Sequence, residues 1–128
     1  MEVWARLLTL VGHWTLLGFG YWAVEEKASG RYIGEIGLSD FKREIEPSFA
    51  GTPEIGWVLS PETHGKGYAT EGARAAIEWG ERNLPSTRTV CIIAPENAPS
   101  IRVAEKLGYR EFARSTFRNE PIVLFERP

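Results

Sequence analysis

The sequence predicts an α/β domain built on a mixed β-sheet. An apolar run at 54–59, a glycine-rich loop at 64–69, an amphipathic helix and a second apolar run at 88–94 form the pattern of a strand–helix–strand unit. The two strands of such a unit are expected to be parallel, with a right-handed crossover. Segments on either side, at 21–38 and 109–127, predict antiparallel hairpins that extend the sheet.

The composition is that of a globular domain, and we expect residues 1–128 to form a single one. Hydrophobic residues make up 43% of the 128 and charged residues 25%, both ordinary values. The net charge of −2 argues against a general nucleic-acid-binding protein, which would carry a basic face. No run approaches the roughly 18 apolar residues of a membrane span, and the segment after Glu2 lacks the pattern of a signal peptide.

Cys91 is the single cysteine of the chain. It excludes a disulfide within the chain and indicates a reduced, cytoplasmic setting. Because Cys91 lies inside an apolar run with no histidine nearby, we interpret it as a small core residue rather than a nucleophile.

Residues 2–17 are predicted to form the first helix. Four apolar residues recur at helical spacing and are expected to pack on the core; they are Val3, Leu7, Leu8 and Val11. The segment 18–23 superficially matches a dinucleotide-binding fingerprint, but that fingerprint needs a strand before it and a helix after it. Here a helix precedes and a strand follows, so we interpret the segment as a turn.

Strands at 21–27 and 31–38 are expected to form a hairpin, turned at Ala28-Ser29-Gly30. Gly34 and Gly37 lie inside the second strand, which suggests a bulge or a close neighbour. Residues 39–53 form a long polar loop. It either lines a binding site or is a solvated excursion, and the sequence leaves both readings open.

The stretch 54–83 organises the rest of the chain. Gly65 and Gly67 let the backbone turn sharply between the strand and the helix. A helix start carries roughly half a positive charge and several unpaired N–H donors, so this loop is suited to an anion such as pyrophosphate. The plainer alternative is a connection that uses glycine for the turn alone. In a strand–helix–strand unit, ligands bind at the carboxyl ends of the strands, which places the loop beside 95–97.

A second helix is predicted after the 88–94 strand. Asn97 is a good N-cap, Pro99 fits the first turn and Gly108 suits the position after the helix. The terminal hairpin is predicted to turn at 119–121.

These residues carry a resemblance to a known family. The blocks at 53–59, at 64–71, and at 97–100 with 105–109 resemble the GNAT superfamily of acetyl-coenzyme A-dependent N-acetyltransferases, within it the ribosomal-protein (RimJ/RimL-like) branch. The resemblance implies a mostly antiparallel sheet whose central parallel strands splay apart. It also implies that the strand and helix with which the family usually begins are missing. That absence suggests either a truncated chain or another chain that completes it, and a bare edge at 21–27 could be covered by a second copy in a homodimer.

The resemblance implies acetyl-coenzyme A as cosubstrate, with no metal. Residues 65–70 would bind the pyrophosphate, with charge from Lys66, and 57–59 would pair with the pantetheine arm. Asn97 would hold the arm from the other side. The implied cofactor-binding residues are Trp57, Val58, Leu59, His64, Gly65, Lys66, Gly67, Tyr68, Ala69, Thr70, Asn97, Ser100 and Lys106. His64 departs from the family pattern, because arginine or glutamine is commoner there.

Two residues are candidates for proton transfer. An amine must be neutral to attack, and a lysine amine has an ordinary pKa near 10.4, so a base helps. Glu54 stands where many family members keep a glutamate base; alternatively it caps the strand or pairs with an arginine. The family's usual acid, a tyrosine, is replaced by Ala104, and the branch suggests Ser100 instead. Alternatively Ser100 bonds backbone in the first helical turn.

The sequence therefore predicts an enzyme that transfers acetyl from acetyl-coenzyme A to a primary amine, on a protein N-terminus or a small molecule. The alternative is a non-catalytic coenzyme A-binding or protein-interaction module, suggested by Ala104 and by the missing front part. A nucleotide-binding enzyme is disfavoured because no Walker loop is present. No nucleic-acid or membrane partner is expected.

Overall fold

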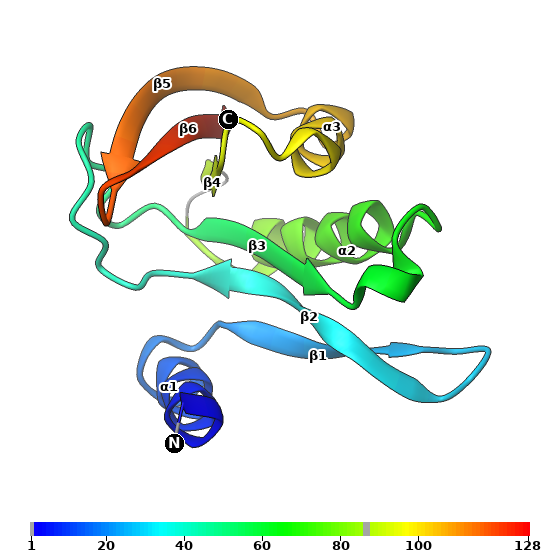
Figure 1. Cartoon of the computed structure of the whole chain (residues 1–128). Coiled ribbons are helices and arrows are strands. Elements are labelled where there is room, and N and C mark those ends of the chain that lie inside the picture. The colour runs from blue at the N-terminus through cyan, green and yellow to red at the C-terminus, as the bar shows by residue number, and fades with distance from the viewer. Residues whose placement is uncertain (1, 86–87) are drawn as a thin grey trace.

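The computed structural model describes residues 2–85 and 88–128, and it confirms an α/β fold with a mixed sheet. Six strands lie in the order β1-β2-β3-β4-β6-β5. In Figure 1, α1 lies beside the edge strand β1, α2 runs along β3, and α3 lies near the opposite end of the sheet. The elements are α1 (Glu2–Leu17), β1 (Tyr21–Glu26), β2 (Arg31–Ser39), β3 (Glu54–Leu59), the 3-10 turn η1 (Pro61–Thr63), α2 (Tyr68–Asn83), β4 (Thr89–Ile93), α3 (Ala98–Lys106), β5 (Arg110–Phe117) and β6 (Glu120–Arg127).

The central strands β3 and β4 are parallel, as predicted, and they splay apart. They pair at Glu54 and Val90, where the Val90 N–H donates to the Pro53 carbonyl at 3.0 Å. All other neighbouring strands in the sheet are antiparallel. The gap between β3 and β4 therefore opens toward their carboxyl ends.

The two faces of the sheet differ in character. Paired residues share a face, so Leu38 lies with Ile55 and Ile36 with Trp57, on the side covered by α2. This side holds the main core, which Ala73, Ala76 and Ile77 of α2 complete, and Cys91 is buried within it as predicted. Glu54, Gly56 and Val58 alternate with these residues and face the other side.

Glycine is required where the first three strands meet. A Cβ on Gly34 would overlap the Val58 carbonyl, and one on Gly37 would overlap the Gly20 carbonyl. The register between β1 and β2 also shifts at Val24 and Glu25, opposite Gly34. Both expectations for these glycines, a bulge and a close neighbour, are confirmed.

The prediction for the packing face of α1 is wrong, although the helix itself is present. Val3, Leu7, Leu8 and Val11 are all exposed, each by 49% or more. The helix packs instead through the side that carries His13 and Trp14.

His13 explains why a polar residue can lie on the packed side of α1. Its Nδ1 donates to the Phe19 carbonyl at 2.6 Å, and its Nε2 accepts from the Asp40 N–H at 2.9 Å. Trp14 packs edge-on against Trp22 and Trp79 and donates to the backbone. The polar atoms of both side chains thus find backbone partners, which hydrophobic periodicity cannot register.

The turn of the terminal hairpin also differs from the prediction. Arg118 and Asn119 form it, both with positive φ (53° and 65°), while Glu120 and Pro121 already belong to β6. A two-residue hairpin turn of this kind needs positive φ at both positions, which asparagine tolerates well. Pro121 is accommodated because β4 pairs with β6 only from Val123 to Arg127, so no ladder bond to β4 needs a donor at Pro121.

Two glycine substitutions should change stability in opposite directions. Gly34→Ala should destabilise the fold by at least about 2 kcal/mol, because the residue has a φ of +148° and no room for a Cβ. Gly12→Ala in α1 should stabilise it by about 0.5–1 kcal/mol, since nothing lies within 4 Å and alanine favours a helix. Urea denaturation of both variants measures the two values, and a Gly34→Ala variant as stable as wild type would contradict the register described here.

Candidate functional site

A cavity of about 450 Å³ lies where β3 and β4 diverge. It is bounded by the end of β3, by the loop into α2 with the first turn of that helix, and by one side of α3. The lining residues are Trp57, Val58, Leu59, Thr63, His64, Gly65, Gly67, Tyr68, Ala69, Thr70, Asn97, Pro99, Ser100, Arg102, Val103 and Lys106.

The cavity brings together all the predicted cofactor-binding residues except Lys66. Four lining residues were missed by the sequence reasoning: Thr63, Pro99, Arg102 and Val103. Three of these lie on α3: Arg102 and Val103 follow Pro99 by three and four residues, and Lys106 follows it by seven, so helical spacing could have found them. Binding of a cofactor by these residues stays a prediction.

The loop into α2 presents unpaired donors to the cavity. Gly65 and Gly67 have φ of +83° and +80°, and Gly67 is the N-cap of α2 with no side chain to cap the first turn. The N–H groups at the start of a helix have no partner within it, and here residues 68–70 line the cavity. Together with the helix dipole, this end of the cavity is suited to an anion.

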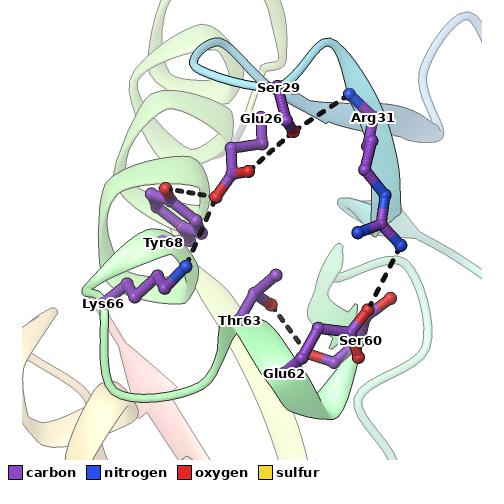
Figure 2. Close-up of polar contacts among 8 residues, drawn as sticks. All are labelled: Glu26, Ser29, Arg31, Ser60, Glu62, Thr63, Lys66 and Tyr68. Carbon is purple, nitrogen blue, oxygen red and sulfur yellow. Dashed lines mark hydrogen bonds and ion pairs between the residues drawn. The ribbon is translucent and has the colours of Figure 1, made fainter.

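The two side chains nearest the glycines do not direct charge into the cavity. His64 donates from Nε2 to the Leu59 carbonyl at 3.1 Å, so its ring fixes the loop. The Lys66 Nζ lies 3.6 Å from Glu26 Oε2, on the side of the β1–β2 hairpin (Figure 2). Positive charge at the cavity is supplied instead by Arg102 and Lys106 of α3.

On the far wall of the cavity, Ser100 joins α3 to β3. The Asn97 Oδ1 accepts from the Ser100 N–H at 3.3 Å, which confirms the predicted N-cap. The Trp57 indole Nε1 donates to the Ser100 Oγ at 3.3 Å. Because the hydroxyl accepts from Trp57, its own proton can be donated to a bound group.

Glu54 lies at the apex of the gap and not on the cavity wall. It is 5% exposed and its Oε1 accepts from the Arg43 Nε at 2.7 Å. Arg43 in turn lies over the rings of Phe41 and Phe117, at 5.4 and 5.1 Å. The pairing with an arginine, one of the alternatives for Glu54, is therefore present, and a role as base stays a prediction.

Burial controls the proton affinity of this side of the sheet. Burial raises the pKa of Glu54, while the Arg43 guanidinium opposes the rise. Tyr21 packs across Gly56, and burial together with the Glu54 charge raises the pKa of Tyr21 to about 12. A carboxyl whose pKa is raised is better suited to accept a proton than an ordinary glutamate.

The loop between β2 and β3 supplies Arg43 and is anchored at its middle. Ile45 is buried against Ile122 and Leu124 of β6. Ile45 thus anchors the segment to the sheet and places Arg43 beside Glu54, while residues 46–48 and 50–51 are exposed to solvent.

Within residues 2–85 and 88–128, no helix is both long and apolar enough to cross a membrane. In the same part of the chain, no three or more His, Cys, Asp or Glu side chains are grouped so that they could hold a metal ion.

Comparison with known proteins identifies relatives of this chain. The family model described as "Acetyltransferase (GNAT) domain" matches residues 1–110. The uncharacterized protein YkkB of Bacillus subtilis is 33% identical over 110 residues, covering 86% of this chain and 62% of YkkB, so the chain spans less than two thirds of that relative.

Two solved structures share the fold over nearly the whole chain. A putative GnaT-family acetyltransferase from Bordetella pertussis matches with a TM-score of 0.90 and 32% identity, over 98% of this chain and 75% of that one. The ribosomal-protein-S5-alanine acetyltransferase from Vibrio fischeri matches with a TM-score of 0.76 and 26% identity, over 98% and 70%. The name of the second agrees with the resemblance to the ribosomal-protein branch.

The raised pKa of Glu54 predicts how its contribution to stability varies with pH. The folded state holds a proton that the unfolded chain releases near the ordinary value of 4.5. The contribution is therefore complete below that value and is lost as the pH rises through the folded pKa. The unfolding free energy of wild type minus that of Glu54→Gln should fall as the pH rises from 4.5 through the raised pKa of Glu54 in the folded state, measured by urea denaturation. A difference that grows with pH would mean that Arg43 outweighs burial.

Proposed function

The chain belongs to the GNAT acetyltransferase family, and we propose that it binds acetyl-coenzyme A in the cavity described above and transfers the acetyl group directly to a primary amine. The observation that carries this proposal is the cavity at the splay of β3 and β4. An uncapped helix start lies on one side of it and a donor hydroxyl, that of Ser100, on the other. These two features suit two parts of the cosubstrate, its pyrophosphate and its thioester.

The phosphate end would be held mainly by backbone groups. The N–H groups of residues 68–70 have no partner within α2, and these residues line the cavity. The positive φ of Gly65 and Gly67 shapes the loop that precedes them. Arg102 and Lys106 add positive charge from α3. This arrangement tolerates His64 in place of arginine, because the charge does not need to come from that position.

The pantetheine arm would pair with β3 in place of β4. Backbone groups alternate sides along a strand, so those of Trp57 face the same side as the Pro53 carbonyl, which bonds β4. Beyond Glu54 that side of β3 faces the gap. The Trp57 N–H and carbonyl are therefore available to an extended amide-containing chain lying in the gap.

Acetyl transfer needs a base for the amine and a partner for the departing sulfur. Glu54 would accept the proton of the attacking amine, directly or through water, from the face of the sheet opposite α2. The amine nitrogen then bonds the acetyl carbon while the carbon–sulfur bond breaks. Ser100 would donate a hydrogen bond to the departing thiolate. The acceptor amine, on a protein N-terminus or a small molecule, would approach from the Glu54 side.

One observation favours the non-catalytic alternative. Glu54 does not line the cavity and its carboxylate is paired with Arg43. If Arg43 holds the carboxylate in this pair when cofactor and acceptor are bound, the chain would bind coenzyme A without transferring acetyl.

Coenzyme A should bind the protein at micromolar concentrations in calorimetry, and Gly67→Ala should weaken binding about tenfold. An added Cβ strains the left-handed conformation and disturbs the first N–H groups of α2. Gly51→Ala is the matched control: its φ of +82° is nearly the same, it has equally open surroundings, and it lies outside the cavity. It should leave affinity unchanged. No heat of binding with wild type would overturn the proposed cofactor.

Glu54→Gln should lower the turnover of an amine found by an acetyl-transfer screen by at least about 100-fold near neutral pH, with coenzyme A affinity unchanged. The amide cannot accept the proton but fills the same space. Turnover is followed by release of coenzyme A across a range of pH. Equal turnover at every pH would remove Glu54 from the role of base, and no transfer to any amine by wild type would favour the non-catalytic alternative.

A further inference from the structure

Glu26, the last residue of β1, reaches the loop that precedes α2 from the neighbouring hairpin. Its Oε2 accepts from the Tyr68 hydroxyl at 2.7 Å and lies 3.6 Å from the Lys66 Nζ. Its Oε1 accepts from the Ser29 hydroxyl at 2.7 Å, which fixes the carboxylate at the hairpin turn. Figure 2 shows these contacts converging on the Glu26 carboxylate. Tyr68 lies 42 residues after Glu26 in the sequence, so the contact joins two distant segments.

Glu26 contacts Lys66 and Tyr68, which lie on either side of Gly67. The backbone here has few other restraints. Lys66 lies between Gly65 and Gly67, and the space beside both glycines is open, with nothing within 4 Å of a Cβ built on either. Glycine has the widest conformational freedom of any residue, so this segment would lose much entropy if a ligand had to order it. Tyr68 is the first residue of α2 and lines the cavity.

The other contacts of the loop act at its beginning. Thr63 donates to the Ser60 carbonyl at 2.7 Å, and His64 bonds Leu59. Arg31 and Glu62 also join the hairpin to this segment, but at 3.8 Å and with both side chains more than half exposed. Such a pair contributes little. Among the described residues, Glu26 is the side chain of the β1–β2 hairpin whose hydrogen bond and ion pair reach both Tyr68 and Lys66.

We propose that Glu26 is a positioning residue of the cofactor site, which holds the glycine loop and the start of α2 in their binding conformation before the ligand arrives. The inference rests on the proposed binding of coenzyme A at this site. A carboxylate that accepts from a hydroxyl makes a stronger bond than a neutral acceptor. The bonds from Ser29 and Tyr68 lower the pKa of Glu26, so the carboxylate is charged at neutral pH. By holding Lys66 outward, Glu26 also leaves the ligand's phosphates to the backbone donors.

The test is a double-mutant cycle on coenzyme A affinity, measured by calorimetry on folded protein well below each variant's melting temperature. Glu26→Ala should weaken binding about tenfold and Tyr68→Phe, which keeps the ring, should weaken it three- to tenfold. The double variant should bind no more weakly than Glu26→Ala, because both changes remove the same link. Glu26→Gln should stay within about threefold of wild type, since its amide oxygen still accepts from Tyr68.

Glu62→Ala is the matched control, because it breaks the other contact between hairpin and loop without touching Lys66 or Tyr68. It should leave the affinity unchanged. Wild-type affinity in Glu26→Ala, or additive effects in the double variant, would overturn the positioning role while leaving the proposed function intact. If wild type itself bound no coenzyme A, the proposed function would fall and the positioning role with it.

Discussion

The divergence of β3 and β4 is the constraint on which the rest of the structure depends. The two strands pair at Glu54 and Val90 and then separate, so β3 beyond this point has a neighbour on one side and a gap on the other. An unpaired strand edge inside a sheet ordinarily destabilises a protein, because its backbone N–H and C=O groups lack hydrogen-bond partners. Here the edge borders a cavity whose other walls are α2 and α3. In the proposed function, this gap would let the inner backbone of the sheet contact the bound cosubstrate.

The two faces of the sheet present different groups. The α2 side is apolar and packed, and its loops form the cavity. The opposite side carries Glu54, Tyr21 and Arg43, arranged with aromatic rings around the guanidinium. Glu54 stands at the point where the strands part. The balance between its burial and its pair with Arg43 therefore decides how readily it accepts a proton.

Much of the site is held by contacts between segments that are distant in sequence. Glu26 contacts Tyr68 and Lys66 from the β1–β2 hairpin, and Trp57 of β3 contacts Ser100 of α3. The Glu26 contacts join the glycine loop and the start of α2 to β1. The Trp57 contact joins the start of α3 to β3. The rigid sheet thereby positions elements whose own backbone would tolerate several conformations.

The sequence by itself determined the local elements. The strand–helix–strand unit, the glycine loop and the N-cap at Asn97 follow from patterns that span a few residues, because periodicity, positive φ and capping act between near neighbours. The tertiary structure alone decided which side of α1 is buried, where Lys66 points, and that Arg43 pairs with Glu54. The positions of Lys66 and Arg43 depend on side chains brought together from segments far apart in the chain. The packing of α1 depends on polar side-chain atoms that find backbone partners. Neither kind of contact leaves a signal in the local spacing of residues.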